Sequence, residues 1–211
     1  MVRRRVWLSL GMSAALLSLS GCDKLPGLSA GNGKPSVPFN AVDITGADYG
    51  RKLSLPDLDG KTRTMADFKG KVTVVFFGFT QCPEVCPTTM AELAQVKKSL
   101  GADGDRVQGV FVTIDPERDT PAVLKGYLSS FDPSFVALRG NLDQTAEAAK
   151  DFKVFYAKVP GKSPGEYTME HTAGSYVFDA SGKLRLFTRY VPGGAGATAL
   201  TADLKQLLTQ G

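Results

Sequence analysis

At the centre of this chain stands the segment Gly78-Phe79-Thr80-Gln81-Cys82-Pro83-Glu84-Val85-Cys86-Pro87. A continuous β-branched and aromatic run from Val72 to Phe79 leads into it and predicts a strand that is buried on both faces. Pro87 is well placed to start a helix, and from Thr88 on apolar residues recur at spacings of three and four, which predicts a helix that ends at Gly101: Met90, Leu93, Val96 and Leu100. Two thiols four residues apart therefore lie at a strand-to-helix junction.

The remainder predicts further strands alternating with helices. Leu53 to Leu55 and Thr62 to Met65 flank the turn signal Asp59-Gly60 and predict a β-hairpin. Four more strands are expected over Val107 to Ile114, Phe135 to Leu138, Tyr176 to Phe178 and Leu184 to Tyr190. Helices are expected from Thr120-Pro121, over Leu142 to Phe152 and over Thr198 to Leu208. The pattern indicates one α/β domain over residues 40–211, a mixed sheet with helices on both faces and an N-terminal hairpin.

The first 21 residues have the features of a bacterial export signal: three arginines, an apolar stretch from Val6 to about Leu19, and small residues at its end. The apolar stretch is shorter than the roughly 20 residues of a membrane span, so a transmembrane anchor is the less favoured alternative. Arg3, Arg4 and Arg5 supply three of the four positive charges in the net charge of +4. No basic stripe remains in the rest of the chain, which argues against a nucleic-acid partner.

The end of this signal, Leu19-Ser20-Gly21-Cys22, resembles the lipobox of bacterial lipoproteins. That resemblance implies that Cys22 becomes the first mature residue and carries the lipid that anchors the protein. Asp23 resembles the inner-membrane retention signal of Gram-negative lipoproteins. Residues 22–39 are rich in glycine, proline and serine, which predicts a flexible tether. We therefore expect a domain that is lipid-anchored to the inner membrane and faces the periplasm, an oxidising compartment in which thiols are exposed to oxidation.

The paired thiols predict a metal or redox site. On a helix, a spacing of four would place the sulfurs of Cys82 and Cys86 on the same side. The positive end of the helix that follows would lower a cysteine pKa and favour the thiolate. Two interpretations without a metal or redox function are that the cysteines are inert core residues, or that they form a permanent disulfide, which would close only a very small loop. A structural zinc site needs about four protein ligands, more than the mature domain offers.

His171 is the only histidine of the chain. A lone histidine is more often an ordinary core or surface residue than a ligand. This one, however, follows an expected loop with prolines and glycines at residues 160–165 and precedes the strand near Tyr176, a setting in which functional side chains gather. Two thiolates and one imidazole suit copper, because sulfur favours Cu(I) and imidazole can serve both oxidation states.

Three motifs resemble the Sco/SenC family. They are Phe77-Gly78-Phe79-Thr80-Gln81-Cys82-Pro83-Glu84-Val85-Cys86-Pro87-Thr88-Thr89, Thr113-Ile114-Asp115-Pro116-Glu117-Arg118-Asp119-Thr120-Pro121 and His171-Thr172-Ala173-Gly174-Ser175-Tyr176. The resemblance extends from about Phe39 to the end and implies a thioredoxin-like fold in which Cys82, Cys86 and His171 hold copper. It also implies a role in assembling the dinuclear copper centre of cytochrome c oxidase, by delivering copper or by keeping the target cysteines reduced. The oxidase subunit that carries that centre is then the expected partner.

Two features favour metal handling over general disulfide exchange. Thioredoxin-type reductases usually carry two residues between their cysteines, whereas three separate Cys82 from Cys86. They also carry a proline at the position we expect near Ala173 to Ser175, and none occurs here. A reductase role would add a thioredoxin-like reductant as a second partner. For Asp115 and Asp119, a role in the turn and at the start of the next helix is favoured over one in receiving the partner or tuning the site.

Overall fold

The central strands are β4 (Val72–Gly78) and β5 (Val107–Thr113), which pair in parallel from Val72 opposite Val107 to Gly78 opposite Thr113. Both are buried at every position, as their continuous apolar sequences predict. The computed structural model describes residues 38–193 and 195–210. The expected export signal, Cys22 and residues 22–37 of the expected tether lie outside these described residues.

One six-stranded sheet contains these strands, in the order β1-β10-β9-β4-β5-β6. β6 (Val136–Leu138) continues the parallel part, while the strands on the other side run antiparallel: β9 (Gly174–Phe178), β10 (Leu184–Arg189) and β1 (Val42–Asp43). The predicted mixed sheet is thus confirmed. The β9–β10 hairpin is confirmed as well, whereas the two-residue strand β1 was not predicted.

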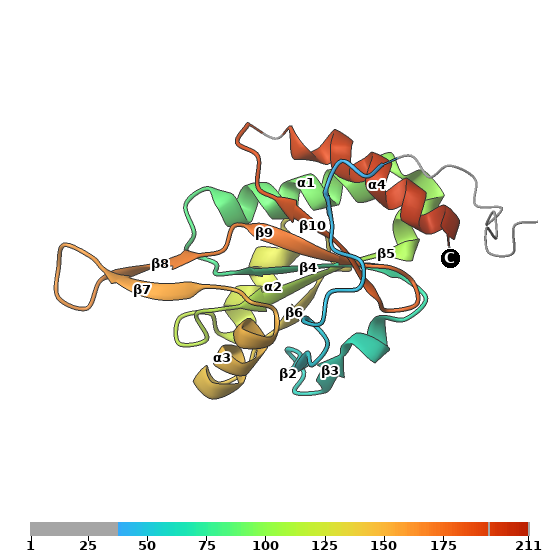
Figure 1. Ribbon diagram of the computed structural model, residues 1–211. Coiled ribbons are helices and arrows are strands. Elements are labelled where there is room, and N and C mark those ends of the chain that lie inside the picture. Colours follow the sequence, from blue (N-terminus) through green and yellow to red (C-terminus); the bar gives the residue numbers. More distant parts are fainter. Residues whose placement is uncertain (1–37, 194, 211) are drawn as a thin grey trace, which may run out of the picture. The chain divides into compact units, whose positions relative to one another are not determined.

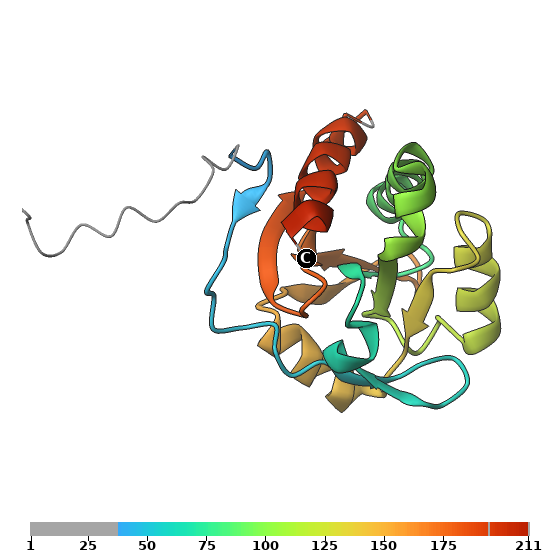
Figure 2. The same ribbon diagram turned by 90° about the vertical axis from the view of Figure 1, so that its right-hand side faces the viewer.

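Helices cover both faces of the sheet (Figures 1 and 2). α1 (Val85–Ser99) and α4 (Gly196–Gln210) lie side by side over one face, and α2 (Pro121–Ser129) and α3 (Leu142–Asp151) lie over the other. α2 begins as predicted, because Thr120 Oγ1 accepts a hydrogen bond from the Val123 amide at 3.3 Å. Two short 3-10 helices complete this part: η1 (Met65–Phe68) and η2 (Gly101–Arg106).

The predicted N-terminal hairpin is formed by β2 (Ser54–Pro56) and β3 (Thr62–Thr64), which pair only with each other among the described strands. Asp57, which follows β2, forms an antiparallel bridge with Leu138 of β6. The Asp57 carboxylate accepts hydrogen bonds from the amides of Asp59 and Lys61 and thereby holds the turn closed. The hairpin therefore covers the β6 edge of the sheet.

The segment before His171 differs from the sequence prediction. Where a loop was expected, β7 (Tyr156–Pro160) and β8 (Tyr167–His171) pair antiparallel, with Tyr156 opposite His171. This two-stranded ribbon, called here the histidine ribbon (residues 156–171), extends beyond the six-stranded sheet (Figure 1). Its strands are short and alternate in exposure, so the prolines and glycines of its turn dominated the sequence pattern.

Candidate metal centre

The two cysteines lie where β4 passes into α1. Cys82 sits in a turn, in which its amide donates to the Phe79 carbonyl at 3.3 Å. α1 begins at Val85, earlier than the start near Pro87 and Thr88 that the sequence predicts, so Cys86 belongs to its first turn. The Cys86 amide donates to Cys82 Sγ at 3.4 Å. Cys86 is fully buried, whereas Cys82 is half-buried, so the pair has an inner and an outer sulfur.

Gly78, the last residue of β4, makes room for the inner sulfur. A Cβ atom at this position would lie 2.9 Å from Cys86 Sγ and 2.6 Å from the Phe76 ring, closer than real Cβ contacts come. Neither neighbour can move aside easily, because both are 0% exposed. The glycine thus allows the thiol of Cys86 to pack directly against the end of the central strand.

His171 ends β8 and brings its imidazole to the sulfurs. Its Nε2 lies 3.5 Å from Cys86 Sγ, and its Nδ1 lies 3.0 Å from the Thr172 carbonyl oxygen. Because a carbonyl only accepts, Nδ1 carries the proton and Nε2 presents its lone pair to the thiols. The rings of Phe76 and Phe79 pack edge-on against the imidazole, each with its centroid 5.9 Å from that of His171.

The two Sγ atoms and a ring nitrogen of His171 therefore converge, and all three lie within 4.8 Å of one another. Among the described residues, this is the one group of three or more cysteine, histidine or acidic side chains with a metal-binding arrangement. The structure brings together every metal-site residue that the sequence singled out. Two sulfur donors and one nitrogen donor fit a soft metal ion better than a hard one.

The two thiols differ in acidity. The side chain of Cys86 donates a hydrogen bond to Cys82 and lowers the pKa of Cys82 to about 4; burial opposes this, while the amides of Cys86 and Glu84 support it. Burial, followed by the neighbouring Cys82, raises the pKa of Cys86. The expectation of a lowered pKa at the helix end thus holds for Cys82 and is wrong for Cys86. A metal that takes both sulfurs must displace the Cys86 proton.

Asp119 braces the segment between β4 and α1, called here the cysteine loop (residues 79–84), a role that was not predicted from the sequence. Its carboxylate accepts from Thr80 Oγ1 and Thr113 Oγ1, each at 2.6 Å, and from the Thr80 amide at 3.2 Å. The expected role at the helix start belongs to Thr120, the residue that caps α2. Asp115 does accept the Asp119 amide in the expected turn, at 3.0 Å. The signal for the missed role was a carboxylate between Thr113 and the helix cap, at the carboxyl end of a buried strand.

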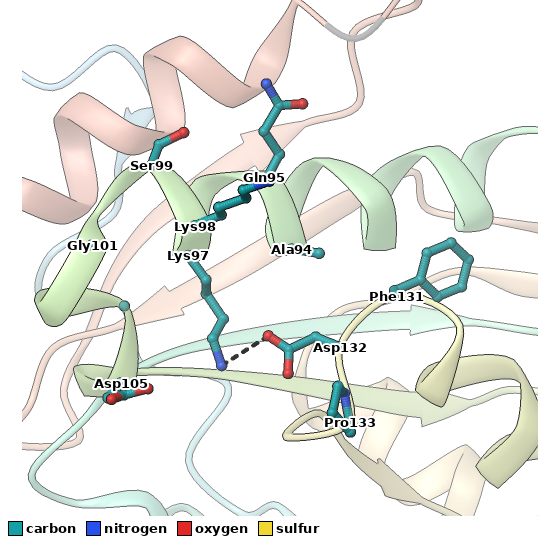
Figure 3. A pocket seen from close by; sticks show the side chains of 11 residues that line it. Ala94, Gln95, Lys97, Lys98, Ser99, Gly101, Asp105, Phe131, Asp132 and Pro133 are labelled. Atoms are coloured by element: carbon teal, nitrogen blue, oxygen red, sulfur yellow. Dashed lines mark ion pairs between the residues drawn. The ribbon is translucent and has the colours of Figure 1, made fainter.

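A surface groove of about 870 Å³ lies apart from this centre (Figure 3). It runs between the end of α1, η2 and the segment after α2, and none of the three candidate ligands lines it. Lys97 Nζ and Asp132 Oδ2 form an ion pair there at 3.2 Å. In residues 38–193 and 195–210, no helix combines the length and the apolar character needed to cross a membrane.

Comparison with known proteins identifies the family. The SCO1/SenC family profile matches residues 42–209. This chain belongs to the SCO1/SenC family. The SCO2-like protein of Rickettsia felis is 39% identical over 135 residues, 64% of this chain and 66% of that protein. The mitochondrial SCO2 homolog of Mus musculus is 35% identical over 156 residues, 73% of this chain and 60% of that protein. The match thus spans about two thirds or less of these curated relatives.

Solved structures of the family are similar as well. Bradyrhizobium japonicum ScoI with copper bound is 42% identical and has a TM-score of 0.64, over 74% of this chain and 96% of that one. The apo Sco1 protein of Thermus thermophilus is 36% identical, with a TM-score of 0.71 over 82% and 99%. These likenesses confirm the expected α/β fold of the thioredoxin-like class.

Proposed function

We propose that this protein is a copper metallochaperone that serves the assembly of the dinuclear copper centre of cytochrome c oxidase. The observation that carries the proposal is the convergence of Cys82 Sγ, Cys86 Sγ and a His171 ring nitrogen within 4.8 Å. Family members described with copper bound support it, namely Bradyrhizobium japonicum ScoI, 42% identical, and yeast Sco1, 30% identical. The partner that this role requires is the oxidase subunit that carries the copper centre.

The donor set fits copper as cargo in either oxidation state. Two thiolates are ligands that Cu(I) favours, and the imidazole adds a donor that also suits Cu(II). The hydrogen bond from Nδ1 to the Thr172 carbonyl fixes the ring so that Nε2 faces the sulfurs. Because Cys82 is half-buried, a partner thiolate could approach the outer sulfur directly, while Cys86 holds the ion from within.

Anaerobic copper titration of a soluble fragment from Phe39 onward tests the proposal. We expect one copper per reduced domain, loss of binding in Cys82→Ala and Cys86→Ala, and weakened binding in His171→Ala. Gly126→Ala in α2 is the control, because a Cβ at that position meets nothing within 4 Å and the change leaves the three candidate ligands in place. If wild type and His171→Ala bound copper equally, the histidine would not be a ligand. If reduced wild type bound none, the chaperone function itself would be refuted.

We also propose the arrangement that the sequence indicates around the domain: an export signal over residues 1–21, lipid on Cys22, a tether over residues 22–39 and the copper-binding domain over residues 40–211. This would hold the domain at the inner membrane, facing the periplasm. A SCO1/SenC family lipoprotein of Bacillus anthracis, 28% identical with a TM-score of 0.61, supports it. Mass spectrometry of the mature N-terminus tests it: a lipid-modified Cys22 is expected in wild type, and soluble protein in Cys22→Ser.

A second function, thiol–disulfide reductase for the oxidase cysteines, is favoured by the lowered pKa of Cys82. Cys82 is half-buried and has a pKa of about 4, so it is a thiolate at neutral pH, and Cys86 lies next to it as a resolving thiol. The reduced domain would give two electrons to a target disulfide and form the Cys82–Cys86 disulfide, to be reduced again by a thioredoxin-like partner. His171→Ala should retain this activity. Failure of reduced wild type to reduce an oxidised target peptide would exclude it.

A further inference from the structure

Arg118 joins three segments around the candidate metal centre. It lies in the turn between β5 and α2, and its Nε donates to the Asp115 carboxylate. Its Nη1 donates to Gln81 Oε1 at 3.0 Å and to the Tyr167 carbonyl at 2.8 Å. Gln81 immediately precedes Cys82, and Tyr167 is the first residue of β8, the strand that ends at His171. One planar group thus connects the cysteine loop with the histidine ribbon.

Aromatic contacts extend this connection to the imidazole. The guanidinium carbon of Arg118 lies 3.7 Å from the centroid of the Tyr167 ring and 5.9 Å from that of Phe79. Tyr167 Oη in turn donates to Asp115 Oδ1 at 2.9 Å. Phe79 is the ring that packs edge-on against His171. The Arg118 side chain is 20% exposed and that of Asp115 is 1% exposed, so these contacts are largely shielded from water.

The histidine ribbon needs such a connection. Its two strands pair with each other and with none of the six strands of the main described sheet. The ribbon is held at its base by the pairing of Thr172 with Phe155 and at its flank by the exposed pair of Lys158 and Glu117. Besides the packing of Phe79 against His171, Arg118 ties the ribbon to the loop that carries Cys82 through its hydrogen bonds to Gln81 and Tyr167.

We propose that Arg118 is the positioning residue of the copper site, fixing the histidine ribbon against the cysteine loop so that the imidazole stays beside the sulfurs. The inference rests on the proposed copper function. Two thiolates can hold Cu(I) without a third ligand, whereas Cu(II) depends on the imidazole. Replacing Arg118 should therefore lower the affinity for Cu(II) more than the affinity for Cu(I). A general structural role would instead weaken both oxidation states together.

Two variants and a control separate these outcomes. Arg118→Gln removes the positive charge and the planar set of guanidinium N–H donors. Arg118→Lys keeps the charge but lacks both this set of donors and the flat surface that stacks on the Tyr167 ring. Lysine also removes Nη2, which is buried without a hydrogen-bond partner in the described structure, so the loss of that one atom breaks no hydrogen bond. Arg139→Gln is the control. Arg139 follows β6 and donates to the carbonyls of Asp119 and Pro116, at 2.9 and 2.8 Å, and neither acceptor belongs to the histidine ribbon or to the cysteine loop.

The test compares Cu(II) and Cu(I) binding in the soluble domain from Phe39 onward. For Arg118→Gln we expect Cu(II) affinity to fall roughly ten- to a hundredfold, as for other lost outer partners of metal ligands, with a weaker thiolate-to-Cu(II) absorption band. The Cu(II) affinity of Arg118→Lys should lie between that of Arg118→Gln and that of wild type. Cu(I) affinity, measured by chelator competition, should change less than about threefold. Arg139→Gln should match wild type in both.

Hydrogen exchange of the metal-free domain supplies an independent readout. Arg118→Gln should speed exchange at residues 156–171 while β4 and β5 stay protected. Unchanged Cu(II) binding in both Arg118 variants, equal losses for Cu(I) and Cu(II), or unchanged exchange would overturn the inference. If Arg118→Gln fails to fold, Arg118→Lys decides by the same criteria. If wild type binds no copper, the proposed function fails, and the exchange measurement still tests whether Arg118 holds the ribbon.

Discussion

The two sides of the candidate metal centre are built in opposite ways. The cysteine side directly follows β4, a strand that is buried at every position, and Cys86 is itself fully buried in the first turn of α1. His171 follows Cys86 by 85 residues and lies on the histidine ribbon, outside the main sheet. The positions of this ribbon are mostly exposed or half-buried. One side is therefore fixed by the core, and the other by a few contacts at its base and flank.

This difference separates what each side can control. Disturbing the cysteine side changes both sulfurs and the fold that carries them, and so affects Cu(I) and Cu(II) together. Disturbing the histidine side moves one donor and leaves the fold in place. An element with few buried contacts opens at a lower free energy than the core strands do. The ribbon is thus the part of the site that can release its donor without unfolding.

The strongest way to break the cysteine side is Gly78→Ala. The new methyl group would overlap Cys86 Sγ and the Phe76 ring, at 2.9 and 2.6 Å, and neither is free to shift. We expect a loss of about 2–3 kcal/mol in the free energy of unfolding, as for other overpacked cores, and weaker binding of both Cu(I) and Cu(II). Denaturant titration and copper competition measure the two effects.

Gly126→Ala is the matched control for that substitution. Gly126 lies in α2, and a Cβ there meets nothing within 4 Å. The same change should therefore stabilise the helix by about 0.5–1 kcal/mol and leave copper binding alone. If Gly78→Ala were as harmless as Gly126→Ala, the close packing of Cys86 against the end of β4 would not constrain the site.

A smaller effect is expected from Asp119→Asn, which tests the brace of the cysteine loop through pH. Burial raises the pKa of the Asp119 carboxyl, although bonds from Thr113 and Thr80 oppose it. A raised carboxyl pKa means that the folded state binds the proton more tightly, so the stability contributed by Asp119 is lost as pH rises from about 4 through the folded pKa. The advantage of wild type over Asp119→Asn should be about 1–2 kcal/mol near pH 4 and smaller at pH 7.

Urea midpoints of the reduced, metal-free domain between pH 4 and pH 7 measure this difference. Carboxylates that titrate in both proteins, such as Asp57 and Asp179, cancel in the comparison, so the remaining slope belongs to position 119. An advantage that stays flat or grows with pH would show that Asp119 is held as a stabilised carboxylate instead.

The cysteine side was readable from the sequence because its signals are local. The apolar run from Val72 to Phe79, the helical spacing from Met90 onward and the two thiols between them stand in one continuous stretch. Only its fine detail escaped: α1 begins at Val85, and burial raises the pKa of Cys86 where a helix end was expected to lower it. Burial depends on packing against β4 and its neighbours, which local periodicity does not report.

The histidine side was readable only in part. His171 was singled out because it is the sole histidine, and the family motif around it supported the choice. The ribbon itself was missed, because two five-residue strands around a turn with prolines and glycines give too little alternation to outweigh the turn residues. Arg118 was missed for a different reason: its partners lie 37 and 49 residues away, at Gln81 and Tyr167, and sequence spacing gives no sign of such pairs.

The smallest expected effect concerns the outer flank of the ribbon. Lys158 Nζ pairs with the Glu117 carboxylate and lies 4.7 Å from the centroid of the Tyr167 ring, but both members of the ion pair are 47% exposed. Exposed pairs contribute little, so Lys158→Ala should lower the free energy of unfolding by no more than about 0.5 kcal/mol and leave Cu(II) affinity within about twofold of wild type. Thermal unfolding and Cu(II) competition, each at low and high salt, measure this. A Cu(II) loss as large as that of Arg118→Gln would mean that the ribbon is held by its whole flank, and that the shielded guanidinium has no special part in positioning His171.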